Sequence, residues 1–284
     1  MQLRCGQRTL DLSQPRVVGV LNVTPDSFSD GGRFLDREHA LDHARRMSAD
    51  GADVIDVGGE STRPGAQQVP EADELARVLP VVSTLAGEGM LVSIDTMKPR
   101  VMREAVAAGA AMINDVRALR EPGALEVAAS TSAAVCLMHM RGTPSTMQQD
   151  IRYDDVVEEV RSFLVSRAHA CEAAGIARER IVLDPGFGFG KTVDDNLKLL
   201  NALPAVVDAG YPVLAGLSRK SSLGKVTGRD TTDRLAASLA AMLAAVARGA
   251  SLLRVHDVRE TVDALAVWRA IESRSVTARR PTLR

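Results

Sequence analysis

Eight short apolar runs recur along the chain, and this repetition constrains the fold more than any other feature of the sequence. The runs are VVGVLNV (17–23), VIDVG (54–58), LVSID (91–95), MIND (112–115), AVCLM (134–138), IVLD (181–184), VLAGL (213–217) and LLRVH (252–256). Continuous rather than alternating apolarity is typical of strands that are buried on both faces of a parallel sheet. Apolar residues at helical spacing follow the runs, for example at 38–48, 74–85, 101–108, 156–173 and 235–247. With right-handed crossovers, this alternation predicts an α/β fold, a single (β/α)8 TIM barrel.

Nothing in the alternation of strands and helices suggests a domain boundary. We therefore expect one domain over residues 1–284, with the barrel core at about 16–272. The leading segment up to Asp11 is expected to form a short hairpin across the bottom of the barrel. The tail after Ser273 is expected to fray.

Composition excludes several classes of protein. The formal net charge is −1 over 284 residues, so the chain lacks the basic surface of a nucleic-acid or membrane-surface binder. We find no signal-peptide core and no apolar run near the roughly 18 residues of a membrane span. The three cysteines, Cys5, Cys136 and Cys171, are widely separated, which fits reduced thiols. We expect a cytoplasmic protein.

Polar residues end most of the eight runs. The endings are Asn22, Asp56, Asp95, Asn114, Met138 with His139, Asp184, 218–220, and Arg254 with His256. Active sites of such barrels lie at the carboxyl ends of the strands, so we expect these residues to face one cavity. Helix capping is the alternative for any single position, and Asp115 and Asp257 are candidate caps. A whole layer of buried polar groups without a ligand would be costly, which favours a functional site.

The chemistry of these residues divides in two. Asp95, Asn114 and Asp184, together with Lys220, suit a flat heterocycle rich in amino and N–H groups, and Met138 and Phe189 can contact its faces. Arg254 and His256 lie two apart on a strand and suit a phosphate, with the Thr62 hydroxyl nearby. The Asn22 carbonyl oxygen suits a divalent cation.

Two long loops, 24–32 and 58–65, follow the first two runs. Glycine, proline and polar residues fill both loops, and Phe28 and Arg63 are placed to cover a bound substrate. We interpret the loops as lids. The alternative is an unstructured surface loop.

The sequence does not match several familiar catalytic motifs. The stretch 186–192 resembles a phosphate-binding loop, but Pro185 stands where that motif needs glycine. The stretch 216–220 lacks the second glycine of a nucleophile elbow. The histidines lack zinc-ligand spacing, and covalent catalysis has no clear candidate.

The ordered motifs resemble the dihydropteroate synthase family. They are LNVTPDSFSDGG (21–32), DVGGESTRPGA (56–66), SIDT (93–96), INDV (113–116), LDPGFGFGK (183–191), LSRKS (217–221) and RVHDV (254–258). The match spans roughly 18–269. The resemblance implies joining of 6-hydroxymethyl-7,8-dihydropterin pyrophosphate to p-aminobenzoate in folate biosynthesis, with release of pyrophosphate. It also implies Mg2+ as cofactor, small molecules as the only substrates, and a homodimer.

The resemblance further assigns residues to three parts of the site and to a metal. The implied pterin-binding residues are Asp95, Asn114, Asp184, Lys220, Met138, Phe189 and Gly216. The implied pyrophosphate-binding residues are Asn22, Thr62, Arg63, Arg254 and His256. The implied p-aminobenzoate residues are Phe28, Thr62, Pro64, Phe189, Lys220 and Ser221. The implied ligands of Mg2+ are Asn22 and Asp30.

Two other functions fit a pterin site on this fold. One is a pterin-dependent methyltransferase domain, which would not need the Asn22, Arg254 and His256 anion site. The other is a non-catalytic paralogue that binds a pterin and makes no product.

Overall fold

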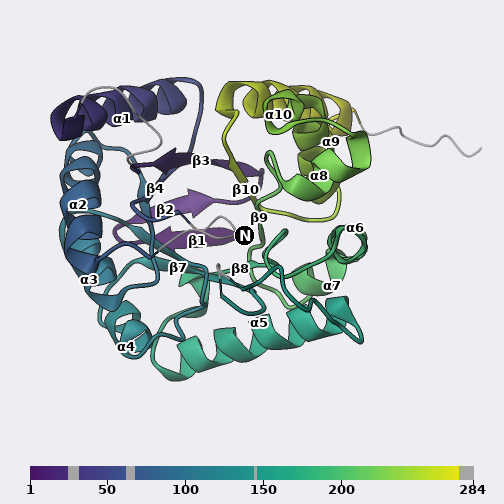
Figure 1. Cartoon of the computed structure of the whole chain (residues 1–284), viewed down its shortest axis with the longest axis horizontal. Helices are drawn as coiled ribbons and strands as arrows, with labels where there is room; N and C mark the ends of the chain where they lie inside the picture. Colours follow the sequence, from purple (N-terminus) through teal and green to yellow (C-terminus); the bar gives the residue numbers. More distant parts are fainter. Residues whose placement is uncertain (25–31, 62–67, 144–145, 275–284) are drawn as a thin grey trace, which may run out of the picture.

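A computed structural model describes residues 1–24, 32–61, 68–143 and 146–274, and strands and helices alternate along it (Figure 1). Eight parallel strands form one sheet in the order β8-β7-β6-β5-β4-β3-β10-β9. The strands are β3 Arg16–Asn22, β4 Val54–Gly58, β5 Val92–Asp95, β6 Met112–Asp115, β7 Ala134–Met138, β8 Ile181–Asp184, β9 Leu214–Ala215 and β10 Leu252–Val255. Four of them, β4, β6, β7 and β8, have the predicted bounds.

Contacts between β8 and β9 close the sheet. Leu183 of β8 and Val213, just before β9, form a parallel bridge, and the Leu183 N–H donates to the Pro212 carbonyl at 2.9 Å. β9 is shorter than the predicted 213–217: it covers Leu214–Ala215, and Val213 before it pairs through the isolated bridge to Leu183. The closed parallel sheet confirms the predicted barrel.

Helices surround the barrel on its outside (Figure 1). They are α1 Gly32–Ala49, α2 Glu71–Gly87, α3 Pro99–Ala107, α4 Ala124–Ala129, α5 Val156–Ala173, α6 Val193–Asn201, α7 Pro204–Val207, α8 Ser221–Thr227, α9 Leu235–Val246 and α10 Val258–Glu272. Short 3-10 turns cover Arg178–Arg180 and Thr231–Asp233. α5 has the predicted bounds, whereas α1 starts earlier than the predicted 38.

Alternation along each strand separates two apolar clusters. Outward residues such as Ile55, Ile113 and Leu183 pack under the helices. Inward residues near the strand starts form a second cluster, which we call the floor. It contains Val18, Val54, Leu91, Met112, Ala134, Cys136, Val182, Leu214 and Leu252.

The N-terminal hairpin completes this floor, as predicted. β1 Gln2–Cys5 and β2 Arg8–Asp11 pair antiparallel and lie across the middle of the barrel in Figure 1. Leu3 and Cys5 point into the floor cluster and are 0% exposed. The barrel is thereby sealed at one end, so any ligand must enter at the other.

A second layer of residues, six of them polar together with Met138 and Gly216, stands above the floor at even spacing along the same strands. Each lies two or four residues after a floor residue, so its side chain points the same way. We call this set the strand-end layer. It comprises Asn22, Asp56, Asp95, Asn114, Met138, Asp184, Gly216 and Arg254.

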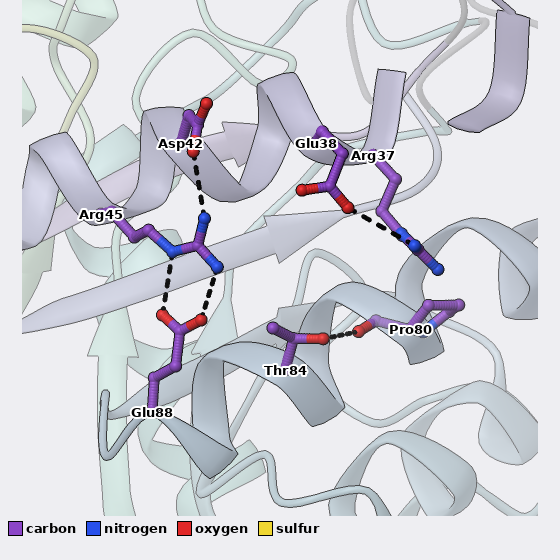
Figure 2. Close-up of polar contacts among 7 residues, drawn as sticks. All are labelled: Arg37, Glu38, Asp42, Arg45, Pro80, Thr84 and Glu88. Atoms are coloured by element: carbon purple, nitrogen blue, oxygen red, sulfur yellow. Dashed lines mark hydrogen bonds and ion pairs between the residues drawn. The ribbon is translucent and has the colours of Figure 1, made fainter. Parts of the chain in front are cut away.

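On the outer wall, charged side chains tie α1 to the end of α2 (Figure 2). Arg45 donates through Nε and Nη2 to both carboxylate oxygens of Glu88, at 3.1 and 2.6 Å, and through Nη1 to Asp42 at 3.0 Å. α2 continues through Pro80, whose carbonyl accepts the Thr84 hydroxyl at 2.8 Å. The Arg45–Glu88 pair joins the two helices at the surface.

The three cysteines are buried and free of disulfides, as expected for reduced thiols. Within the described ranges, no helix is both long enough and apolar enough to cross a membrane.

Replacing Leu3 by Ala should lower the free energy of unfolding by about 2–5 kcal/mol, because it opens a cavity in the floor. The matched control is Leu197→Ala on α6, where the side chain is 43% exposed. That change should cost less than about 0.5 kcal/mol. Urea unfolding followed by circular dichroism measures the free energy of unfolding of both variants. A Leu3→Ala protein as stable as the Leu197→Ala protein would contradict the sealing role of the hairpin.

Candidate active site at the carboxyl ends of the strands

Arg254 is the centre of the strand-end layer. From β10 its guanidinium reaches past β3 and donates through Nε to Asp56 Oδ2 at 2.6 Å and through Nη2 to Asp95 Oδ2 at 2.7 Å. Asn114 Nδ2 donates to the same Asp56 oxygen at 3.0 Å. Asp56 Oδ1 is buried and has no hydrogen-bond partner among the described residues. Four strands thus meet in one charged network that leaves an acceptor for a ligand.

The two other carboxyl groups of this region are strongly affected by burial. Burial raises the pKa of Asp95 to about 7, with Arg254 opposing the shift and the Asp56 charge adding to it. Burial also raises the pKa of Asp184, and its bond from the Gly186 N–H, at 2.7 Å, acts in the opposite direction. Asp95 therefore changes its protonation near neutral pH, which is the behaviour of groups that meet ligands.

Lys220 and Phe189 form the opposite wall. The Lys220 ammonium lies 4.2 Å from the centre of the Phe189 ring. Burial lowers the pKa of Lys220 to about 8, while the Asp184 charge opposes that shift. Phe189 packs against an apolar cluster that includes Met138 and Val116. A flat ring could contact apolar atoms on this side and polar groups on the other.

His256 lies just beyond the end of β10. Ser218 Oγ lies 3.1 Å from its Nδ1 and accepts its backbone N–H at 3.2 Å. Burial lowers the pKa of His256 to about 4, and the charge of Arg254 acts in the same direction. The imidazole is therefore neutral at pH 7 without a ligand, and a bound anion would favour its protonation.

Two glycines leave room in the strand-end layer. A side-chain carbon at Gly58 would lie 3.7 Å from Asp95 Oδ2 and 3.8 Å from Asn22 Oδ1, so these two oxygens flank the same small space. A carbon at Gly216 would lie 4.0 Å from the Arg254 Cβ. The small residues keep the space beside the charged groups open.

The structure brings most of the predicted residues together. Asn22, Asp95, Asn114, Met138, Asp184, Phe189, Gly216, Lys220, Arg254 and His256 all lie at this end of the barrel. Ser221 is exposed at the first position of α8, next to Lys220. The remaining predicted residues, Phe28, Asp30, Thr62, Arg63 and Pro64, lie outside the described residues.

One strand-end residue, His139, does not face the cavity as predicted. It lies an odd number of residues after the floor residue Cys136, so it turns outward and meets Phe163 edge to face at 5.0 Å. Asp115, a candidate helix cap, follows the inward Asn114 and does not cap α4. Its carboxylate instead accepts the N–H groups of Arg117 and Leu119 in the preceding loop, both at 2.8 Å.

The prediction that Asp257 caps α10 is wrong. Its side chain makes no capping bond and instead pairs with Arg219, whose Nε lies 3.0 Å from Oδ2. Arg219, part of the 218–220 ending predicted to face the cavity, is exposed and pairs with Asp257 instead. The Asp257 carboxylate thus pairs with Arg219 instead of accepting the free N–H groups at the start of α10.

Asp56 is one of the strand-end residues predicted to face the cavity, but no binding role was predicted for it, although it accepts hydrogen bonds from both Arg254 and Asn114. A signal for it exists, because Asp56 lies two residues after the floor residue Val54. The same even spacing marks Asn114, Asp184 and Arg254. Counting positions from the floor, rather than from the end of each run, would have excluded His139.

A barrel sealed at one end, with acceptors, cations and an aromatic wall at the other, defines a ligand-binding (β/α)8 enzyme. The sequence model of a family described as "Pterin binding enzyme" matches residues 18–256, so the chain belongs to the pterin-binding enzymes. Dihydropteroate synthase of Escherichia coli is 50% identical over 271 residues, which cover 95% of this chain and 96% of that protein.

Solved structures agree with this assignment. A Xanthomonas albilineans dihydropteroate synthase with 4-aminobenzoic acid is 55% identical, covers 96% of this chain and 98% of that one, and has a TM-score of 0.91. The same organism's enzyme in complex with 7,8-dihydropteroate is 51% identical, with coverage of 96% and 99% and a TM-score of 0.88. Within the pterin-binding enzymes, the chain belongs to the dihydropteroate synthases, which are transferases of folate biosynthesis.

Replacing Asp56 by Asn should lower the pKa of Asp95 from about 7, because it removes a neighbouring negative charge that favours the protonated form. Carbon-13 NMR of the aspartate carboxyl groups measures the titration. Asp194→Asn is the control, since Asp194 lies on the exposed face of α6 with its side chain 72% exposed. An Asp95 that titrates at the same or a higher pH in the Asp56 variant would contradict the network.

Proposed function

We propose that the strand-end layer holds the pterin half of the substrate. Asp95, Asn114 and Asp184 supply acceptors and an amide to the amino and N–H groups of the ring, and Lys220 donates to a ring oxygen or nitrogen. The side chains of Met138 and Phe189 contact its faces, and Gly216 leaves room for it. The observation that carries this assignment is the Asp56–Arg254–Asp95 network, which places acceptors and an anion-binding cation side by side.

The chain is a dihydropteroate synthase, and its reaction exchanges one bond for another. The bond between the pterin methylene carbon and a pyrophosphate oxygen breaks, a bond from the arylamine nitrogen to that carbon forms, and the nitrogen loses a proton. Positive charge that builds up on the methylene is shared with the electron-rich pterin. Because the arylamine is already a neutral nucleophile at pH 7, we propose that Asp184 and Lys220 act through binding and charge stabilisation.

Arg254 and His256 are proposed to bind the pyrophosphate. Nε and Nη2 of Arg254 are engaged by carboxylates, which leaves its Nη1 hydrogens for an anion. The His256 imidazole adds a donor at the same strand end. Thr62 and Arg63, outside the described residues, are proposed to complete this anion site.

The charges support Mg2+ as a cofactor. Three acidic side chains, Asp56, Asp95 and Asp184, lie beside the cations of Arg254 and Lys220, so pyrophosphate would bring negative charge to a site that already holds acidic groups. Asn22 Oδ1 lies beside the space at Gly58, and we propose that it holds the metal together with Asp30. Within the described ranges, no group of three or more His, Cys, Asp and Glu side chains could hold a metal ion. This fits Mg2+, because that ion is usually held by one or two protein carboxylates together with substrate phosphates. When bound, Mg2+ would neutralise charge on the leaving group.

The p-aminobenzoate pocket is proposed to lie beside Phe189 and Lys220, toward the exposed Ser221. Phe28, Thr62 and Pro64 are proposed to form its remaining walls. Exclusion of water from this pocket would protect the electrophilic carbon from hydrolysis.

We also propose that the chain acts in the cytoplasm as a homodimer. Large apolar side chains are exposed on the last two helices: Leu235 is 39% exposed on α9, and Val267 and Ile271 are 62% and 63% exposed on α10. Such residues on adjacent helices suit an isologous contact. Sedimentation at the monomer mass under assay conditions would contradict the dimer.

Purified protein should release pyrophosphate and form dihydropteroate from the pterin pyrophosphate and p-aminobenzoate when Mg2+ is present. Product should require all three components, and a chelator should abolish it. Liquid chromatography with a coupled pyrophosphate assay measures both products. Tight pterin binding without product would indicate a non-catalytic paralogue, and no pterin binding would contradict the assignment of the strand-end layer.

Replacing Lys220 by Ala should lower turnover by about 10²–10³-fold, because it removes a preorganised cation from the pterin site. In the unmodified enzyme, turnover should also fall as the pH rises through about 8, where the Lys220 ammonium loses its proton. Steady-state kinetics across pH tests both. Lys225→Ala, on the exposed side of α8, is the control, and normal turnover of the Lys220 variant would refute the role.

A further inference from the structure

The loop between β8 and α6, residues 185–191, encloses a buried lysine that the proposed reaction does not use. Lys191 is 3% exposed. Its Nζ lies 2.9 Å from the Gly186 carbonyl oxygen, 3.1 Å from that of Phe189 and 3.0 Å from Nδ1 of His139. Nζ also lies 3.4 Å from the His139 carbonyl oxygen. Among the described residues, no carboxylate lies within ion-pair distance of this ammonium.

The backbone of the loop is shaped to surround the ammonium. Gly186, Gly188 and Gly190 have φ values of 67°, 84° and 63°, in the left-handed region that favours glycine. A side-chain carbon at Gly186 would lie 1.9 Å from the His139 carbonyl oxygen, so no other residue fits there without movement. The alternating glycines allow the loop carbonyls to turn toward Lys191.

Contacts on the other side of the loop reach the pterin site. The Gly186 N–H donates to Asp184 Oδ1 at 2.7 Å, and the Phe189 ring lies under the Lys220 ammonium. Gly186 and Phe189 also accept hydrogen bonds from Lys191 Nζ through their backbone carbonyl oxygens. A shift of the loop would therefore move Phe189 and loosen Asp184 together.

Burying the Lys191 ammonium inside this loop costs free energy. Burial lowers the pKa of Lys191 to about 7, the Asp184 charge opposes the shift and Lys220 adds to it. Charged groups without a close counter-ion destabilise a protein interior, so an apolar side chain would serve better if the loop needed only filling. His139 adapts to the ammonium, because burial and Lys191 lower its pKa to about 3 and leave Nδ1 as an acceptor.

We propose that Lys191 is a positioning residue for the pterin site: its ammonium gathers the carbonyls of the 185–191 loop and thereby fixes Phe189 and Asp184 against the substrate. Lys191 itself does not touch the pterin. The inference rests on the proposed function of the strand-end layer, because it assigns the loop to the pterin pocket. It also gives a role to the glycine-rich stretch that fails as a phosphate-binding loop.

The decisive experiment is a double-mutant cycle with Lys191→Met and Phe189→Ala. Lys191→Met keeps the side-chain length and removes the hydrogen-bond donors, and it should weaken pterin binding by about tenfold or more. If Lys191 acts through Phe189, the same change should have much less effect in the Phe189→Ala background. Calorimetric titration with the pterin pyrophosphate in the absence of p-aminobenzoate measures binding without turnover. Lys198→Met on α6, where the side chain is 63% exposed, is the matched control and should bind within about twofold of the unmodified protein.

Folded Lys191→Met protein with unchanged pterin affinity would overturn the proposal, as would two losses that simply multiply. If Lys191→Met does not fold, His139→Phe takes its place, because it keeps an aromatic ring against Phe163 and removes one acceptor from the ammonium. That variant should weaken pterin binding, and unchanged affinity would again overturn the proposal. Failure of the unmodified protein to bind pterin would instead refute the proposed function, so the two failures are distinguishable.

Discussion

The pairing of Arg254 with two buried carboxylates is the interaction on which the rest of the site depends. Asp56 is 1% exposed and Asp95 7% exposed, and burying acidic side chains this deeply is costly unless a group of opposite charge lies beside them. One guanidinium serves both because its planar donors point in different directions. The pairing crosses from β10 to β4 and β5, so it fixes the strand ends relative to one another. It also places the proposed pyrophosphate cation directly beside the proposed pterin acceptors.

The barrel geometry explains how the protein tolerates such a buried charged network. An apolar floor sealed by Leu3 and Cys5 lies beneath it, and alternation along the strands places polar residues two or four positions above that floor. Apolar burial below therefore stabilises the scaffold on which the charged layer is held. The same alternation sends Ile55 and Leu183 outward under the helices. Fold stability and site composition are thus encoded in opposite ends of the same short strands.

Much of this architecture follows from sequence, because buried parallel strands have a strong signal. The runs at 54–58, 112–115, 134–138 and 181–184 became strands with those bounds, and the hairpin up to Asp11 lies where expected. Residue identity at strand ends predicted Asn114 and Arg254 at the cavity. It failed for His139, because one position along a strand reverses the side chain. The Arg254 ion pairs were beyond prediction, since they depend on reach across three neighbouring strands. Lys191 had no signal of its own, because only the fold shows that the preceding carbonyls turn toward it.

Two buried lysines, Lys220 and Lys191, lie on either side of the 185–191 loop and have different roles. Lys220 lies over the Phe189 ring, near Asp184, with a pKa lowered to about 8, so its ammonium is largely retained at neutral pH and faces the proposed substrate. Lys191 lies behind the loop, where its ammonium contacts backbone carbonyl oxygens and the His139 ring. Since both cations share the field of Asp184, loss of either one leaves that carboxylate less compensated. The cost of burying Lys191 is therefore partly offset by the acidic layer that its loop supports, which links the positioning of Phe189 to the electrostatics of the pterin site.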